Sequence, residues 1–133
     1  MNRCALIAFY LAVILICASC WGPKKSVEEE KVLSTLANIQ GNLETRISYQ
    51  QYLELLSLAK AEIDILKRSG KNNPCFMGAI DKCYLYYFTG GKAWKQKLEA
   101  TDEARKNDMD LTMTVLHSQA ALSIQMANNC YNN

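Results

Sequence analysis

Four stretches of the chain carry apolar residues at every third or fourth position, the spacing that gathers side chains on one face of an α-helix. They run from 26 to about 42, from 48 to about 70, from 76 to about 105 and from about 108 to 129. No stretch of the body alternates apolar and polar residues for long, as a strand does. The pattern predicts an all-α fold, a four-helix up-down bundle that follows an N-terminal signal segment.

Local signals mark where the first two helices begin and where the second ends. Ser26 is followed three positions later by Glu29, and Ser48 is followed three positions later by Gln51. Both pairs match the capping box, in which the two residues satisfy each other's backbone amides at a helix start. Gly70 comes after three polar residues and predicts the end of the second helix.

Gly90 and Gly91 interrupt the third predicted helix. Two glycines cost about 2 kcal/mol inside a helix relative to alanine, which would suit a turn. The apolar seam nevertheless continues in phase across them, through Tyr87, Trp94 and Leu98. We therefore favour one long helix, in which the small residues let another helix approach closely.

The chain opens with a basic residue and an apolar run. Arg3 precedes fifteen consecutive apolar residues, 4–18, and small residues follow. The run is shorter than the roughly 20 residues that a membrane-spanning helix needs. This order predicts a secretory signal peptide over 1–19. Two alternatives stay open: cleavage near Ser19 that yields a free secreted or periplasmic protein, and an uncleaved N-terminal anchor.

The end of this run, Cys17-Ala18-Ser19-Cys20, resembles the short motif at which bacterial lipoproteins are cleaved and lipidated. The resemblance implies that Cys20 becomes the first mature residue and carries the lipid. Residues 20–25 would then be a short tether and 26–133 the helical bundle domain. It also implies a cell-envelope protein, anchored to a bacterial membrane on its extracytoplasmic side.

A second resemblance lies in the body. Residues 47–56, together with 59–63, are similar to uncharacterised small exported helical proteins of bacteria. This resemblance implies the helical architecture and carries no function.

The charges favour neither nucleic acid nor a disordered tail. The chain has 15 basic and 13 acidic residues, for a net charge of +2, and the signs are interspersed. Because no basic stripe forms, we do not expect a nucleic-acid partner.

Three cysteines of the body suggest a disulfide, because exported proteins tend to oxidise their thiols. Cys75 and Cys83 lie about 12 Å apart along one helix, too far to pair with each other. If the last two helices form a hairpin that turns at Asn107, Cys130 is level with Cys83, so we predict a Cys83–Cys130 disulfide. Cys75 would then be unpaired or paired with another molecule. A Cys75–Cys130 link would argue against the long third helix. The alternative is three buried, inert thiols.

Aromatic residues gather around the glycine pair. Tyr84, Tyr87 and Trp94 are candidates for a ligand-binding groove between helices. The competing interpretation is that these rings belong to the core and its amphipathic rim, which is the more frequent role of such a cluster.

Met109, Met113 and His117 recur at spacings of four on the last helix. Thioether and imidazole ligands suit copper, especially Cu(I), so this face is a candidate metal site. Methionines at helical spacing more often fill a core, and a lone histidine is often only hydrogen-bonded.

No motif for catalysis or for a cofactor is found in the chain, so we expect a protein that is not an enzyme and needs no cofactor. The leading hypothesis is a cell-envelope lipoprotein that binds a protein partner or acts as a scaffold at the membrane surface. The alternative is a bundle that binds a small ligand or copper. An exposed apolar patch on the first helix would favour a partner, and a closed pocket lined by tyrosines would favour a ligand.

Overall fold

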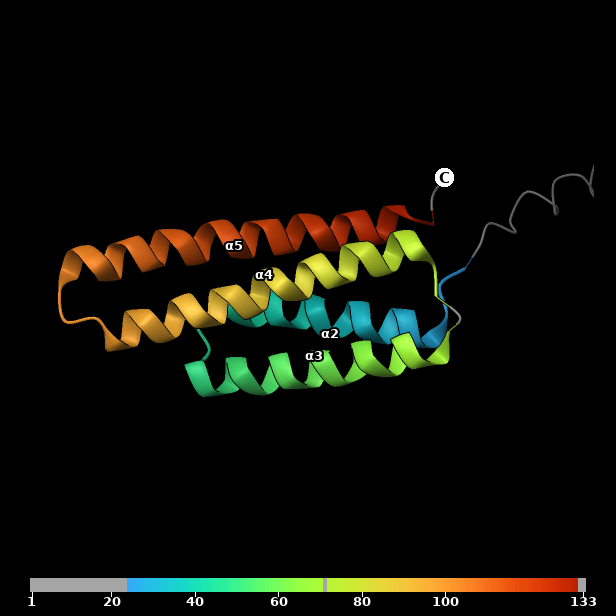
Figure 1. The fold of residues 1–133 in the computed structure, drawn as a ribbon, viewed down its shortest axis with the longest axis horizontal. Coiled ribbons are helices and arrows are strands. Elements are labelled where there is room, and N and C mark those ends of the chain that lie inside the picture. Colours follow the sequence, from blue (N-terminus) through green and yellow to red (C-terminus); the bar gives the residue numbers. More distant parts are fainter. Residues whose placement is uncertain (1–23, 71, 132–133) are drawn as a thin grey trace, which may run out of the picture.

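A computed structural model describes residues 24–70 and 72–131, and over these ranges four long helices run up and down in turn (Figure 1). They are α2 (Val27–Glu44), α3 (Tyr49–Ser69), α4 (Pro74–Glu99) and α5 (Glu103–Asn129). The predicted all-α four-helix up-down bundle is therefore confirmed. The predicted signal peptide, the lipidation site at Cys20 and most of the tether lie outside the described residues.

The predicted helix starts are present in atomic detail. The side-chain oxygen of Ser26 accepts from the backbone N–H of Glu29, whose carboxylate accepts from the Ser26 backbone N–H. Ser48 and Gln51 form the same reciprocal pair at the start of α3. Gly70 follows α3 with a φ of 65°, a left-handed conformation that glycine adopts without strain. Local sequence therefore sets these helix boundaries.

Helix α4 is continuous through Gly90 and Gly91, which confirms the long third helix. The predicted break at 106–108 is wrong, because α4 ends at Glu99 and those residues lie inside α5. Asp102 begins α5 by accepting a hydrogen bond from the Arg105 backbone N–H at 2.8 Å. A run of polar residues can lie on the exposed surface of a helix and so does not mark a break. A side chain that accepts from a free backbone N–H, as Asp102 does, is specific to a helix start.

One core runs the length of the bundle and receives side chains from all four helices. Its largest fully buried members are Tyr52, Tyr87, Phe76, Leu36, Ile39, Ile63, Leu66, Ile80 and Val32. Helix α5 contributes smaller side chains, chiefly Ala120, Ser123, Ile124 and Ala127. Small residues on α5 let it lie close along α4.

A disulfide joins Cys75, in the first turn of α4, to Cys130, the residue that ends α5, with Cα atoms 5.8 Å apart. The prediction of a Cys83–Cys130 disulfide is wrong. Cys83 is a free thiol buried in the core, and this burial raises its pKa to about 12. The disulfide and the long α4 are present together, so the expected conflict between them is also wrong.

The position of the α4–α5 turn explains the different pairing. The hairpin turns near Thr101 rather than at residue 107. When the turn moves by one residue, the α4 residue that lies level with a given α5 residue changes by two positions. Cys75 lies 26 residues before Thr101 and Cys130 lies 29 residues after it, whereas Cys83 lies only 18 before it. The end of α5 therefore reaches Cys75 and passes beyond Cys83.

The disulfide lies at the end of the bundle where both ends of the described chain are found (Figure 1). Here the carboxylate of Glu29 accepts a second hydrogen bond, from the backbone N–H of Asn73 at 3.1 Å. Burial alone would raise the pKa of Glu29, but contacts with the Tyr131 side chain and with the Ser26 and Asn73 amides lower it overall. Glu29 thus links the start of α2, the α3–α4 loop and the C-terminal residues.

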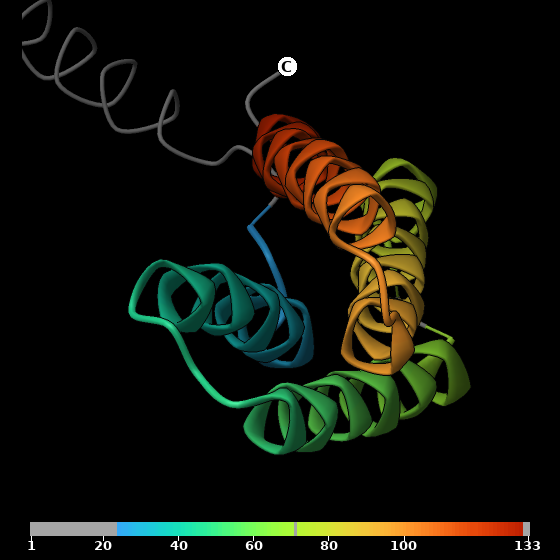
Figure 2. The same ribbon diagram turned by 90° about the vertical axis from the view of Figure 1, so that its left-hand side faces the viewer.

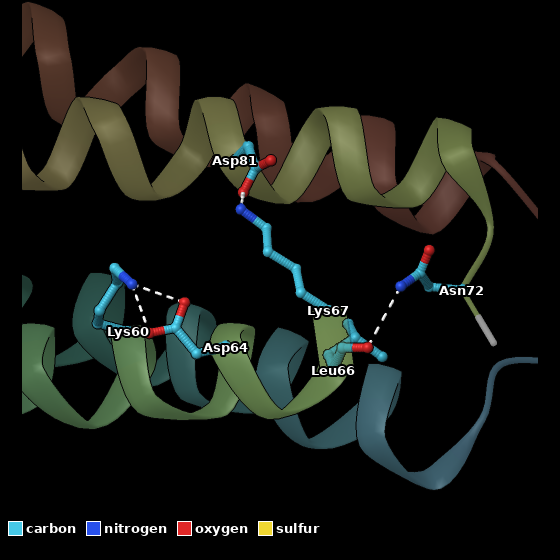
Figure 3. Close-up of polar contacts among 6 residues, drawn as sticks. All are labelled: Lys60, Asp64, Leu66, Lys67, Asn72 and Asp81. Atoms are coloured by element: carbon cyan, nitrogen blue, oxygen red, sulfur yellow. Dashed lines mark hydrogen bonds and ion pairs between the residues drawn. The ribbon is translucent and has the colours of Figure 1, made fainter. Parts of the chain in front are cut away.

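Polar contacts join α3 to α4 on the outside of the bundle (Figure 3). Lys67 on α3 and Asp81 on α4 form an ion pair at 2.8 Å. The Asn72 side-chain amide donates to the carbonyl oxygen of Leu66 at 3.2 Å and closes the loop onto the end of α3. Because the Lys67–Asp81 pair is about half exposed, it contributes little to stability.

Candidate functional site

Helices α3, α4 and α5 meet around three rings, those of Tyr52, Tyr87 and His117. The Tyr52 side chain is fully buried, and its hydroxyl donates to the carbonyl oxygen of Tyr87 at 2.6 Å. The His117 ring centroid lies 6.0 Å from the centroids of both tyrosine rings. We call these three residues the ring cluster. Burial raises the pKa of both tyrosines, so both hydroxyls remain protonated near neutral pH.

The glycine pair makes this close packing possible. A Cβ atom on Gly90 would lie 2.8 Å from Nε2 of His117, and one on Gly91 would lie 3.1 Å from Cε1 of Tyr52. Since real Cβ atoms do not approach other atoms to 2.8 Å, no alanine fits at Gly90 unless the imidazole moves. The two glycines therefore admit α5 on one side of α4 and α3 on the other.

His117 is half-buried, and burial lowers its pKa below the usual 6.5. Its Nε2 lies 3.5 Å from the Tyr52 hydroxyl oxygen, at the outer limit of a hydrogen bond. The Tyr52 proton is already donated to Tyr87, so a hydrogen bond with His117 requires that Nε2 carry the hydrogen. In that tautomer the imidazole donates toward the Tyr52 hydroxyl oxygen.

Two adjoining hollows lie between the C-terminal part of α2 and α5, and they share Leu43, Thr114 and His117. Their volumes are about 290 and 330 Å³, and we call them together the His117 groove. The end-on view shows α2 and α5 well separated at this end of the bundle (Figure 2). The groove is open and of a size that suits a small molecule or a protein side chain.

Basic and apolar residues line the groove together. Arg46, in the α2–α3 loop, borders it and adopts a φ of 61°, a left-handed conformation that is unusual for a residue with a side chain. Lys97 also lines it and pairs with Asp110 at 2.6 Å. In the first hollow Asp110 offsets Lys97, which leaves Arg46 as the unpaired positive charge, whereas the second hollow is lined by the acidic Glu44.

The predicted aromatic site is divided by the structure. Trp94 lines the His117 groove and lies with its ring centroid 5.4 Å from that of Tyr52. Tyr87 is fully buried in the core, whereas Tyr84 stacks with Phe88 on the α3 side of α4 and lines a different hollow. The three residues therefore do not form one pocket, and the core interpretation holds for Tyr87.

The predicted metal face is also only partly assembled. Met113 and His117 line the same groove, but Met109 is not among its lining residues. Within the described ranges, no group of three or more His, Cys, Asp or Glu side chains is placed to hold a metal ion. Nε2 of His117 lies against Tyr52 and Gly90.

A second surface was not recognised in the sequence. Leu111, Val115, Leu122 and Met126 of α5 are 65%, 52%, 50% and 52% exposed. At 3.6 residues per turn they fall within an arc of about 60°, opposite the face that packs into the core. We call these four residues the α5 stripe. Its signal was present in the chain as apolar spacings of four, seven and four residues.

The α5 stripe lies in a segment without charge. Residues 111–133 contain no Lys, Arg, Asp or Glu, although 21% of the whole chain is charged. Exposed helix faces of monomeric proteins normally carry such charges. On α2, by contrast, the large apolar side chain that stands exposed is Val27. Between the first and the last helix, it is therefore the last that carries several exposed apolar side chains.

The class that this fold defines is the all-α four-helix up-down bundle. Comparisons with protein families, with curated proteins and with solved structures found no match. None of the helices described is long and apolar enough to cross a lipid bilayer.

Proposed function

We propose that this chain is a non-enzymatic cell-envelope lipoprotein whose helical body binds a partner protein at the membrane surface through the α5 stripe. The single observation that carries the proposal is an exposed apolar stripe on a helix face without charge. Exposed apolar side chains gathered on one face mark interaction sites. Covering the four half-exposed side chains would contribute about 1 kcal/mol each.

The arrangement of the bundle suits a tethered binding module. The first described residue, Lys24, lies three residues before α2 and only four positions after Cys20. A lipid on Cys20 would hold the Glu29 end of the bundle near the membrane. Helix α5 ends at this same end of the bundle and runs its length, so the Met126 end of the stripe would lie nearest the membrane and the Leu111 end farther from it (Figure 1).

Two exposed leucines offer a matched test of the stripe. Leu122 on α5 is 50% exposed and Leu58 on α3 is 49% exposed. We expect the full-length chain to recover a membrane partner that Leu122→Glu loses and Leu58→Glu keeps. Equal recovery by both variants would contradict the proposal.

The anchor is tested separately. Mass spectrometry of the mature N-terminus should find a lipid on Cys20, and Cys20→Ala should release the protein from membranes. An unmodified Cys20 would contradict the lipid anchor, and the position of the N-terminus would then separate a free protein cleaved near Ser19 from an uncleaved anchor; either result would leave the stripe proposal standing.

A second candidate function rests on Arg46. A non-glycine residue with a left-handed backbone costs about 1–3 kcal/mol and is found preferentially at functional sites. Arg46 is such a residue and borders the His117 groove, beside Trp94 and Met113. These side chains suit a small ligand that has an apolar body and an acidic group.

The probe for this second candidate is anilinonaphthalene sulfonate, which combines an apolar ring system with an anionic group. We expect the native chain to bind it, Arg46→Gln to weaken binding, and Arg68→Gln, an exposed change on α3, to leave binding unchanged. Retained affinity in Arg46→Gln would exclude the groove as its site.

A further inference from the structure

We propose that the partner of the α5 stripe is a second copy of this chain, and that two α5 helices pack antiparallel about a two-fold axis between Ser118 and Gln119. This inference rests on the proposed function, because it names the occupant of the same surface. It is carried by three properties of α5: the spacing of the stripe, the absence of charge and the place of Asp108.

The spacing of the α5 stripe is symmetric. Leu111 and Val115 are four residues apart, Leu122 and Met126 are four residues apart, and the two pairs are equidistant from the midpoint between 118 and 119. In a two-fold symmetric contact every residue pair occurs twice. If residue i of one copy touches residue j of the other, then residue j of the first copy touches residue i of the other. An antiparallel pair with its axis at this midpoint would set Leu111 against Met126 and Val115 against Leu122. All four side chains of each copy would then be covered at once.

The absence of charge matches the same arrangement. A two-fold interface places one patch against itself, so any charge near the axis meets an identical charge. The nearest charged side chain before the stripe is Asp110, and none follows Leu111 on α5. His117 is turned toward the core and has a lowered pKa because of burial, so it adds no charge near neutral pH.

Asp108 decides between the antiparallel and the parallel direction. It is exposed and lies three residues before Leu111, so it extends the stripe by one helical turn. In a parallel pair two Asp108 carboxylates would oppose each other. In the antiparallel pair Asp108 lies opposite Asn129, which is exposed and whose amide can donate to a carboxylate. Antiparallel packing also opposes the two helix dipoles, which is favourable.

The size of the contact indicates a weak dimer. The stripe from Leu111 to Met126 extends about 22 Å along α5. A single helix-to-helix contact of this length buries less than the roughly 800 Å² per partner of a stable complex. Confinement of both copies to one membrane would raise their effective concentration, so the proposed anchor would favour pairing without new contacts.

Cysteine cross-linking of the full-length chain in membranes tests the register. Val115→Cys and Leu122→Cys, carried on two differently tagged copies, should give a disulfide-linked pair under mild oxidation. Val115→Cys alone should not, because its two sulfurs would be offset by seven residues, about 10 Å along the helix axis, beyond disulfide reach. The unaltered chain and Leu58→Cys serve as controls for the native cysteines and for random collision.

The outcomes separate this inference from the proposed function. A 115–122 link in the non-reduced peptide map, with at least a tenfold lower yield from Val115→Cys alone, supports the antiparallel pair. Efficient self-linking of Val115→Cys overturns the antiparallel direction. If the cross-linking yield is no higher than that of Leu58→Cys, the stripe does not bind a second copy of the chain. The proposed function would still be supported if a different protein is recovered by the unaltered chain and by Leu58→Glu but not by Leu122→Glu.

Discussion

The Nε2 atom of His117 on α5 lies 2.8 Å from the position that a Cβ atom of Gly90 on α4 would occupy. This contact shows why a long helix keeps a residue that costs about 1 kcal/mol relative to alanine. On the other side of α4, Gly91 gives the same access to the buried ring of Tyr52. The glycine pair therefore sets how closely three helices approach around the ring cluster.

The first prediction compares two glycines of α4. Gly78 has no atom within 4 Å of the place that a Cβ would take, so Gly78→Ala should stabilise the bundle by up to about 1 kcal/mol. Gly90→Ala must displace the imidazole, and overpacking typically costs about 1–3 kcal/mol. Urea unfolding should find Gly90→Ala at least about 1 kcal/mol less stable than Gly78→Ala. Equal stabilities would mean that the imidazole moves at no cost.

The second prediction concerns protonation of His117, the only histidine of the chain. Burial lowers its pKa in the folded protein, so the unfolded state binds the proton more readily. The contribution of the neutral ring to stability should be complete above about pH 6.5, the unfolded value, and should fall as the pH drops through the folded pKa. NMR titration of the imidazole should give a midpoint below 6.5, and the urea-unfolded chain should titrate normally. A folded midpoint at or above 6.5 would contradict this.

The third prediction concerns the Cys75–Cys130 disulfide, which closes a loop with a sequence separation of 55. In the chain-entropy account, a loop of this length contributes about 4 kcal/mol of stability. Reducing agent should therefore lower the melting temperature of the unaltered protein and leave a Cys75→Ala/Cys130→Ala variant unchanged. A non-reduced peptide map that contained Cys83 in a disulfide would refute the pairing.

The fourth prediction uses Glu29, whose pKa is lowered because Tyr131 and two backbone amides outweigh the effect of burial. A carboxyl with a lowered folded pKa stabilises the fold above the unfolded value, near 4.5, and loses this effect as the pH falls through the folded value. Glu29→Gln should therefore reduce stability at pH 7 and flatten the loss of stability that follows as the pH falls below about 4.5. Glu28→Gln, an exposed change in the same turn, is the matched control and should keep the slope of the unaltered chain.

The amino-acid sequence by itself determined the helices and most of their ends. The caps at Ser26 and Ser48 and the stop at Gly70 act through hydrogen bonds and backbone angles within a few residues, so they can be predicted without knowledge of the neighbours. The in-phase seam across Gly90 and Gly91 was also sufficient to predict a continuous α4. The sequence further contains the stripe spacing on α5, on the side of the helix opposite its core-facing seam.

Only the tertiary structure decided which of these faces meet. The disulfide partner of Cys130 depends on where the α4–α5 hairpin turns, and a displacement of about six residues was sufficient to exchange Cys83 for Cys75. Tyr84, Tyr87 and Trp94 are close in sequence, but the helix directs them to different neighbours, and His117 joins Tyr52 from 65 residues away. Periodicity gives the direction of each side chain from its own axis. The rotation and level of one helix against another arise from packing among all four, which is why the ring cluster and the His117 groove appear only in the folded protein.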